Sequence, residues 1–282
     1  MRLIKVTGGL GNQMFIYAFY YHMQKIHPNT CLDLSDMKHY HVHHGYELHK
    51  VFAHLPANEI CINRVVKKVM EFLFFRTILE RKQPYGAVEV FMRKRFWPLV
   101  YFKGFYQSEL FFAPVAGEIR RLFAFDASKA NARSRELAAR LAADPRSVSL
   151  HVRRGDYATA KHWENLGSVC GLAYYRNALE ELGRRVPGAA FYVFSDDVPW
   201  AKENLPLPGA VYVDWNKGED SWQDMWLMSL CRNHVICNSS FSWWGAWLDP
   251  HADKVVVAPE RWFRNGEAPS ICPESWIKVP IN

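Results

Sequence analysis

Two adjacent arginines, Arg153 and Arg154, stand just after the place where a strand is expected to end. The run before them, Ser147 to Leu150, alternates apolar and polar residues, which predicts a strand ending near His151. In open α/β sheets, ligands bind outside the carboxyl ends of the strands. Paired guanidinium groups there suit a diphosphate, because they match phosphate oxygens bidentately. The alternative is a surface salt-bridge pair at a strand end.

A glycine-rich turn near the start of the chain is a second candidate site. The run Gly8-Gly9-Leu10-Gly11-Asn12-Gln13 joins an expected strand to an expected helix. Gly9 and Gly11 allow a ligand to approach the backbone closely, and the amides of Asn12 and Gln13 can bind sugar hydroxyls or phosphate. The turn departs from the dinucleotide fingerprint, because the third glycine is absent at the required offset. A pure packing role is the alternative.

Polar residues also follow two further expected strands. Asp196 and Asp197 come after the first, where one carboxylate could accept hydrogen bonds from a guanine edge or from ribose hydroxyls while the other caps a helix. The second is followed by the run Asn238-Ser239-Ser240-Phe241, which begins a helix and can hold an anion at its positive end. Simple helix capping is the alternative for both. The tryptophans that follow, Trp243, Trp244 and Trp247, are expected mainly in the core.

The sequence offers little sign of a metal site. A dense histidine segment (His39, His41, His43, His44 and His49) has no helical pair with a partner carboxylate, so we interpret it as a polar loop near the acceptor. No Asp-x-Asp is present to hold Mg²⁺ or Mn²⁺ under a sugar diphosphate. Arginines can neutralise a leaving diphosphate instead. We therefore expect no cofactor and no metal.

Composition limits the class of protein. The 282 residues are 49% hydrophobic, which is ample for a sizeable core, and the net charge of +7 with a pI near 9.1 favours acidic partners. No basic tract or known module supports nucleic-acid binding. Six scattered cysteines without a Cys-x-x-Cys pair fit reduced thiols. No signal peptide or membrane-spanning stretch is evident, so we expect a cytoplasmic protein.

Strands alternate with helices along the chain, which predicts parallel βαβ units. We expect strands over 3–7, 31–33, 101–105, 147–151, 191–194, 211–213, 235–237 and 255–257, and helices over 14–27, 128–143, 172–186 and 223–231. Residues 57–81 read as mainly helical, and a further helix is expected to open at 108–112. The simplest architecture is two Rossmann-like halves, 1–145 and 146–282.

Taken together, the motifs resemble the α-1,2-fucosyltransferase family, glycosyltransferase family 11. The resemblance rests on the glycine turn, Phe105-Tyr106-Gln107-Ser108-Glu109, the arginine motif from His151 to Tyr157, Phe194-Ser195-Asp196-Asp197, and the run from Asn238 to Leu248. It implies a GT-B-type fold whose two parallel sheets face a cleft, with the acceptor on the first half and the donor on the second. It also implies inverting, metal-independent transfer of L-fucose from GDP-fucose to the 2-hydroxyl of a terminal galactoside.

The resemblance implies roles for the candidate residues. Arg153 would bind the departing diphosphate, with Arg154 and His151 in the same donor motif, and Asn12 would lie near the donor phosphate and sugar. Asp196 or Asp197 would read the guanine. Asn238, Ser239, Ser240 and Phe241 would hold phosphate, and Gly9, Gly11 and Gln13 would complete the donor site. Asp156 is the first candidate for the general base, with Glu109 and Asp33 as the others.

Other interpretations remain open from the sequence. The chain could use another GDP-deoxysugar or form another acceptor linkage, or it could be a carbohydrate-binding protein that lacks catalysis and uses its tryptophans as sugar platforms. A nicotinamide oxidoreductase is disfavoured by the incomplete glycine fingerprint. Basic and aromatic residues alternate over Lys67–Arg81, which allows weak peripheral contact with a membrane. A free oligosaccharide, a lipid-linked repeat unit and a glycoprotein all fit as the galactose-terminated acceptor.

Overall fold

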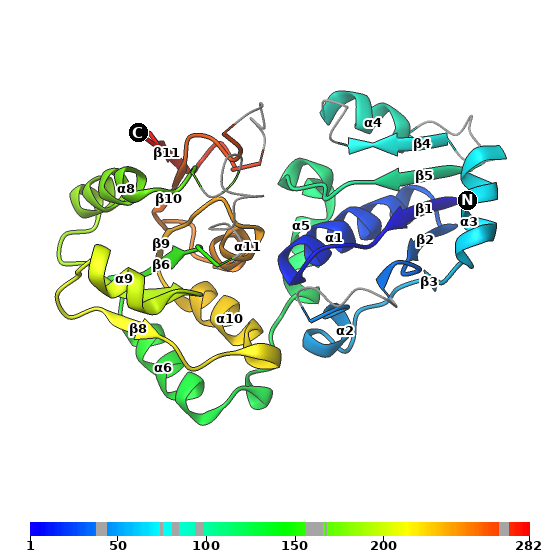
Figure 1. The fold of residues 1–282 in the computed structure, drawn as a ribbon. Coiled ribbons are helices and arrows are strands. Elements are labelled where there is room, and N and C mark those ends of the chain that lie inside the picture. The colour runs from blue at the N-terminus through cyan, green and yellow to red at the C-terminus, as the bar shows by residue number, and fades with distance from the viewer. Residues whose placement is uncertain are drawn as a thin grey trace. The chain divides into compact units, whose positions relative to one another are not determined.

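The computed structural model describes residues 1–37, 44–73, 76–80, 85–93, 99–155, 166, 168–264 and 271–282. The chain forms two compact units, Met1–Phe125 and Asp126–Asn282, each of which is described by itself (Figure 1). The second unit begins at Asp126 rather than at residue 146, because the helix α6 (Ala132–Ala143) packs against α10 (Trp222–Leu230). Among the described residues, no helix is long and apolar enough to cross a membrane.

The first unit is a parallel sheet in the order β3-β2-β1-β5-β4. Its strands are β1 (Arg2–Lys5), β2 (Thr30–Asp33), β3 (Glu59–Ile60), β4 (Arg76–Leu79) and β5 (Val100–Lys103). Its helices are α1 (Leu10–Ile26), α2 (Leu48–Val51), α3 (Arg64–Leu73), α4 (Tyr85–Arg93) and α5 (Ala116–Leu122), with the 3₁₀ helices η3 (Glu109–Phe111) and η4 (Ala113–Val115).

Strand β1 lies at the centre of this sheet, and its neighbours β2 and β5 lie on opposite sides of it. The chain therefore leaves β1 in one direction and returns beside it through β5, so a topological switch point lies between β1 and β5. The glycine turn and the Phe105–Glu109 motif follow these two strands. The prediction that residues 57–81 are mainly helical is wrong in part, because β3 and β4 lie within this segment on either side of α3.

The second unit is a parallel sheet in the order β11-β10-β9-β6-β7-β8. Read from its first strand, this is the strand order 3-2-1-4-5-6 of dinucleotide-binding folds. The strands are β6 (Ser147–Val152), β7 (Ala190–Ser195), β8 (Val211–Val213), β9 (Asn233–Val235), β10 (Val256–Pro259) and β11 (Ile277–Val279). Besides α6 and α10, its helices are α8 (Leu172–Arg185), α9 (Val198–Asn204) and α11 (Ser240–Leu248), with η5 (Ala127–Lys129) and η8 (Gly218–Asp220).

Both sheets are parallel and carry helices, so the predicted α/β class is confirmed. In the second unit the switch point lies between β6 and β9, and the arginine motif follows β6 while the Asn238 motif follows β9. The Asp196-Asp197 pair follows β7, the other neighbour of β6. Three predicted motifs therefore lie at the carboxyl edge of adjacent strands.

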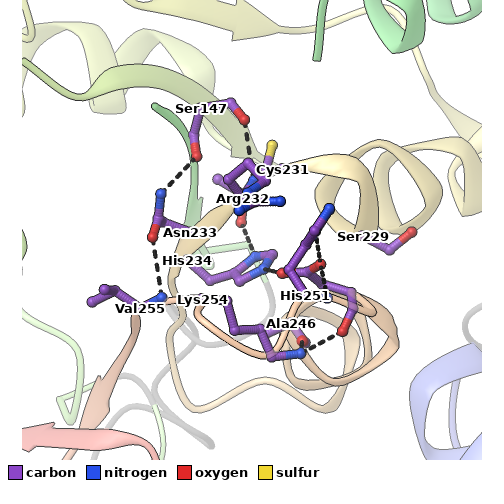
Figure 2. A network of polar contacts seen from close by, with 12 residues as sticks. Ser147, Ser229, Cys231, Arg232, Asn233, His234, Ala246, His251, Lys254 and Val255 are labelled. Atoms are coloured by element: carbon purple, nitrogen blue, oxygen red, sulfur yellow. Dashed lines mark hydrogen bonds and ion pairs between the residues drawn. The ribbon is translucent and has the colours of Figure 1, made fainter. Parts of the chain in front are cut away.

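A buried polar network fixes α11 to the sheet (Figure 2). His234 on β9 lies opposite Ser149 on β6, and its Nδ1 is 2.8 Å from the Ser149 hydroxyl. Its Nε2 is 3.0 Å from Oδ2 of Asp249, which directly follows α11. Burial lowers the pKa of His234. The neutral ring therefore donates from Nε2 to the carboxylate and accepts the Ser149 hydroxyl proton at Nδ1.

The same network closes the carboxyl end of α11. Lys254 Nζ donates to the carbonyl oxygens of Ala246 at 2.7 Å and Asp249 at 2.5 Å, where a cation complements the helix dipole. Trp243, Trp244 and Trp247 pack against one another and are buried, as the sequence predicted. Helix α11, whose amino end follows the Asn238 motif, is thus anchored by these bonds and by its buried tryptophans.

Candidate active site

The arginine pair after β6 is held by the aspartate pair after β7. Arg153 Nη1 lies 3.0 Å from Asp196 Oδ2, and Arg154 Nε lies 3.3 Å from Asp197 Oδ2. Both guanidinium groups are partly exposed, at 30% and 29% of their side-chain surface. The two motifs that the sequence placed at strand ends therefore form one cluster, because β6 and β7 are paired in parallel register.

Asp196 organises the backbone of the arginine loop. Its Oδ1 accepts a hydrogen bond from the Arg154 N–H at 2.8 Å, and its Oδ2 accepts one from the Gly155 N–H at 3.0 Å. A Cβ on Gly155 would lie 2.7 Å from Asp196 Oδ2, so only glycine fits against the carboxylate here. With three donors already on it, Asp196 is arranged to position the loop. The prediction that it reads guanine is untested.

Asp197 and Trp200 hold the second arginine. Asp197 caps α9 by accepting from the Trp200 N–H at 3.2 Å, and the Arg154 guanidinium carbon lies 4.1 Å above the Trp200 ring centre. The cation–π contact and the ion pair fix the guanidinium, yet neither uses its terminal Nη nitrogens. This geometry keeps Arg154 oriented and preserves its capacity to bind an anion.

His151, the residue before the last of β6, is a buried neutral imidazole. Burial, reinforced by the charge of Arg153, lowers its pKa to about 3. Its Nδ1 lies 3.2 Å from Cys237 Sγ, and burial raises the pKa of Cys237 to about 12, so the thiol is protonated and can donate to Nδ1. The ring proton then resides on Nε2. His151 thus adds no charge beside the arginines near pH 7, and it ties the end of β6 to the segment after β9.

The Asn238 motif connects β9 to α11. The buried Asn238 amide donates to the carbonyl oxygens of Leu166 and Trp262, both at 3.1 Å, which binds two loops to the strand end. Ser239 is the N-cap of α11 and accepts from the Phe241 N–H at 3.3 Å. Ser240 and Phe241 form its first turn, and the Phe241 ring lies 6.0 Å from that of His151. The motif therefore lies on the strand next to the arginine motif.

In the first unit the glycine turn makes the amino end of α1. Gly8 has φ +83°, a left-handed conformation that favours glycine, and Gly9 is the N-cap. Gly11 lies within the helix and is buried. Asn12 is partly exposed, and its Oδ1 accepts from Gln107 Nε2 at 2.7 Å. This contact crosses the switch point between β1 and β5 and joins the two motifs of this unit.

Gln13 is fully buried and bonded to the backbone around it. Its Nε2 donates to the carbonyl oxygens of Gly8 at 2.8 Å and Gly45 at 2.7 Å, and its Oε1 accepts from the Glu47 N–H at 2.9 Å. Glu47 Oε2 in turn accepts from the Leu10 N–H at 3.1 Å. Burial raises the pKa of Glu47 to about 7. These contacts fasten the loop around Gly45 to the glycine turn, and the predicted ligand-binding role of Gln13 is untested.

The three candidates for the general base lie in different surroundings or outside the described residues. Asp156 lies outside the described residues. Asp33 is buried at the end of β2. Burial favours a higher pKa for Asp33, but donation from Ser35, Tyr101 and Lys67 holds the pKa below its usual value. Its oxygens are already occupied by these donors, which gives it a structural role. Glu109 is half-buried at the start of η3.

The histidine segment is described only in part, since His39, His41 and His43 lie outside the described residues. His49 Nε2 is 2.6 Å from Glu59 Oε1. Within the part of the chain that the structure describes, no group of three or more His, Cys, Asp or Glu residues could hold a metal ion. The six cysteines are all free thiols.

The family is decided by comparison with known proteins. The model of glycosyl transferase family 11 matches residues 3–278, nearly the whole chain. The chain belongs to glycosyl transferase family 11. The family resemblance seen in the motifs is thus confirmed, and the chain is a glycosyltransferase.

Curated relatives of this family-11 chain differ in the sugar named for them. An alpha-1,2-colitosyltransferase of Escherichia coli is 33% identical over 290 residues, which cover 98% of this chain and 97% of the relative. Galactoside alpha-(1,2)-fucosyltransferase 1 of Homo sapiens is 30% identical over 158 residues, covering 54% of this chain and 43% of that protein. The transferase class is shared by both, whereas the donor sugar is not.

Solved structures identify the fold of this family-11 chain. A mutant of Arabidopsis thaliana FUT1 in complex with GDP matches with a TM-score of 0.51 at 12% identity, covering 96% of this chain and 74% of that chain. The fucosyltransferase NodZ from Bradyrhizobium matches with a TM-score of 0.50 at 13% identity, covering 88% and 93%. The predicted GT-B-type fold is confirmed by these likenesses and by the two parallel sheets.

Several residues that hold these motifs in the two units were not identified from the sequence. Trp200 stacks on Arg154. The available signal was its position three residues after Asp197, which places it on the first turn of the helix that Asp197 caps, and Asp197 is paired with Arg154. Cys237 and Glu47 gave no comparable signal. Cys237 meets His151 across 86 positions of sequence, and Glu47 meets Leu10 across 37, so only the folded chain brings them together.

Proposed function

We propose that this family-11 chain transfers L-fucose from GDP-fucose to the 2-hydroxyl of a terminal galactoside, with inversion and without a metal ion. The observation that carries the proposal is the arginine pair after β6, held by Asp196 and Asp197 at the switch point of a dinucleotide-type sheet. Ligands bind outside the carboxyl ends of strands at such points. Diphosphate is the ligand that paired guanidinium groups match.

The chemistry of the transfer requires this charge. Breaking the bond between fucose and the β-phosphate leaves an electron pair and negative charge on the GDP oxygen, while the sugar ring becomes positive. Arg153 and Arg154 are proposed to stabilise that oxygen, an effect worth roughly 10²- to 10³-fold in kcat for each aligned donor. Because Asp196 and Trp200 already hold the guanidinium groups, little reorganisation is needed when the charge develops.

The amino end of α11 is proposed to share the diphosphate. Ser239 and Ser240 follow β9, the strand that neighbours β6, and lie at the positive end of the nine-residue helix α11. Because His151 is neutral, it adds no positive charge at this edge that would attract Asp196 and Asp197 away from the arginines. Asn12, with Gln107 beside it, is proposed to bind hydroxyl groups of donor or acceptor, and Asp156 remains our candidate for the base that receives the acceptor proton.

The test is calorimetric titration of the protein with GDP in EDTA, compared with Arg153→Ala and with Arg184→Ala as a matched control. Arg184 is an exposed arginine on α8 that pairs with Glu180 and Glu181. We expect GDP to bind without metal, Arg153→Ala to weaken binding at least tenfold and to abolish transfer, and Arg184→Ala to match the wild type. The thermal midpoint of Arg153→Ala should stay near that of the wild type. Unchanged GDP binding by Arg153→Ala would refute the proposal.

A second donor is supported by one observation. The colitosyltransferase relative aligns with nearly the full chain, and colitose is fucose without its 3-hydroxyl group. Turnover of GDP-fucose and GDP-colitose should therefore be compared on one galactoside acceptor. We expect the higher kcat/KM with GDP-fucose. A tenfold preference for GDP-colitose would identify colitose, in place of fucose, as the transferred sugar, without changing the assignment of the diphosphate site. Equal turnover of GDP-mannose would refute the assignment of a deoxysugar donor.

A further inference from the structure

Helix α3, drawn in cyan in Figure 1, directs charged side chains toward its own unit. Lys67 Nζ lies 2.9 Å from the buried carboxylate of Asp33, and Glu71 Oε2 lies 2.5 Å from Lys103 Nζ. Met70, one turn from Lys67, packs against the cluster formed by Leu3 and Tyr101. Lys67 also pairs with Asp36, so the described side chains that α3 presents to its own unit include ion-paired Lys67 and Glu71 together with Met70.

The opposite face of α3 is apolar and exposed. Val65, Val69 and Phe72 recur at helical spacing along one stripe and are 70%, 48% and 89% exposed, and Val66 beside them is 51% exposed. An amphipathic helix on a globular unit normally has the reverse arrangement, with its apolar stripe buried. Contiguous apolar side chains on a surface mark an interaction site. We call these four residues the α3 stripe.

Much of the protein's positive charge belongs to the sequence segment that contains this stripe. Residues 64–95 contain nine Lys or Arg and three Asp or Glu, a net charge of +6 against +7 for the whole chain. Lys68 lies on α3 between Val65 and Val69 and is exposed. Glu71 pairs with Lys103 and Glu89 with Arg93, while Lys67 is itself neutralised by Asp33 and Asp36. Arg76, which follows α3, is exposed like Lys68. The segment that contains the stripe is therefore basic, and Lys68 places one of its charges beside the stripe.

We propose that the α3 stripe docks on an anionic lipid bilayer, with its valines and Phe72 at the boundary of the acyl chains and Lys68 among the headgroups. Apolar burial and attraction to anionic lipid act together in such helices, and each basic residue near the surface adds about a fivefold increase in binding. A second copy of the chain is a poorer occupant, because a symmetric contact would bring two segments of charge +6 together. This placement would hold the enzyme beside acceptors that are attached to lipid.

The experiment is sedimentation of the protein with vesicles of phosphatidylcholine alone and with an equimolar mixture of phosphatidylcholine and phosphatidylglycerol. The variants are Phe72→Ser, Val69→Ser and Lys68→Gln. Leu110→Ser is the matched control, because Leu110 is an apolar residue 41% exposed on η3. All four side chains are exposed, so the thermal midpoints should remain close to that of the wild type.

We expect the wild type to sediment with the anionic vesicles and not with phosphatidylcholine alone. Phe72→Ser should weaken this binding by about tenfold and Lys68→Gln by about fivefold, while Leu110→Ser should leave it unchanged. Raising the salt concentration should weaken it further. Equal binding of Phe72→Ser and the wild type, or absence of anionic-vesicle binding, would overturn the proposal. A dimer in solution that Phe72→Ser dissociates, without vesicle binding, would assign the stripe to self-association instead.

Discussion

Replacing Asp196 with asparagine separates two opposite roles for this carboxylate. It could compete with phosphate for Arg153, in which case its loss would strengthen GDP binding. It could instead position the loop on which the arginines lie, in which case its loss would weaken binding. The geometry favours positioning, since Asp196 accepts from the backbone N–H groups of Arg154 and Gly155 as well as from the Arg153 side chain.

The magnitudes decide the sign. An asparagine side chain has a single oxygen, so in Asp196→Asn at least one backbone N–H loses its acceptor. A hydrogen bond to a charged group contributes about 1.5–3 kcal/mol, and the partial exposure of Asp196 moves the figure toward the lower end. Repulsion between the carboxylate and a bound phosphate amounts to about 1 kcal/mol in a well-hydrated site. We therefore expect Asp196→Asn to weaken GDP binding by about 1 kcal/mol, roughly fivefold.

Calorimetric titration with GDP measures this change, and Asp197→Asn is its matched control. Asparagine caps helices as well as aspartate does, so α9 should keep its start, and only the partly exposed pair with Arg154 is lost. The control should bind GDP within about threefold of the wild type. If Asp196→Asn binds GDP as tightly as the wild type, or more tightly, then Asp196 competes with the ligand and the positioning argument fails.

Three further predictions follow from single positions. Gly155→Ala should lower GDP affinity by about tenfold, because the added Cβ would lie 2.7 Å from Asp196 Oδ2; normal affinity would show that the loop shifts freely. The matched control is Gly183→Ala on α8, where the added Cβ meets no atom within 4 Å. This control should raise the unfolding free energy by about 0.5–1 kcal/mol in a denaturant titration. For Asp224, burial raises the pKa to about 7 from 3.8, so the wild type should lose a few kcal/mol of stability as pH rises between these values. Asp224→Asn should lack that loss when thermal midpoints are compared at low and neutral pH, and parallel profiles of the two proteins would contradict the assignment.

Much of the fold could be predicted from the order of apolar runs. The strand over 211–213 and the helix beginning at Leu172 were predicted at their observed positions or nearly so, because long periodic segments and short β-branched runs carry a local signal. The strands β3, β4 and β11 were missed. Each is a short strand at the edge of its sheet, and a run of two to four residues cannot be told from helix or loop by periodicity alone.

Helix packing, and not the alternation of strands and helices along the sequence, determines where the second unit begins. Helix α6 precedes the first strand of its sheet, so the sequence pattern attached it to the first half. In the folded chain the Asn131 side chain at its start donates to Asn216 at 2.8 Å, and the Asn131 N–H donates to Gln223 at 2.9 Å. These partners lie 85 and 92 positions away, beyond the range of any local pattern.

By itself, the sequence determined which residue types follow each strand, and parallel pairing then brings those strand ends to one edge of a sheet. Arg153, Arg154, Asp196 and Ser239 were identified in this way. Only the tertiary structure decided what these groups do to one another: that Asp196 bonds the arginine loop, that burial keeps His151 neutral, and that α3 turns its valines outward. Hydrogen-bond partners and burial depend on contacts between residues distant in sequence, whereas strand-end positions depend only on local periodicity and chain order.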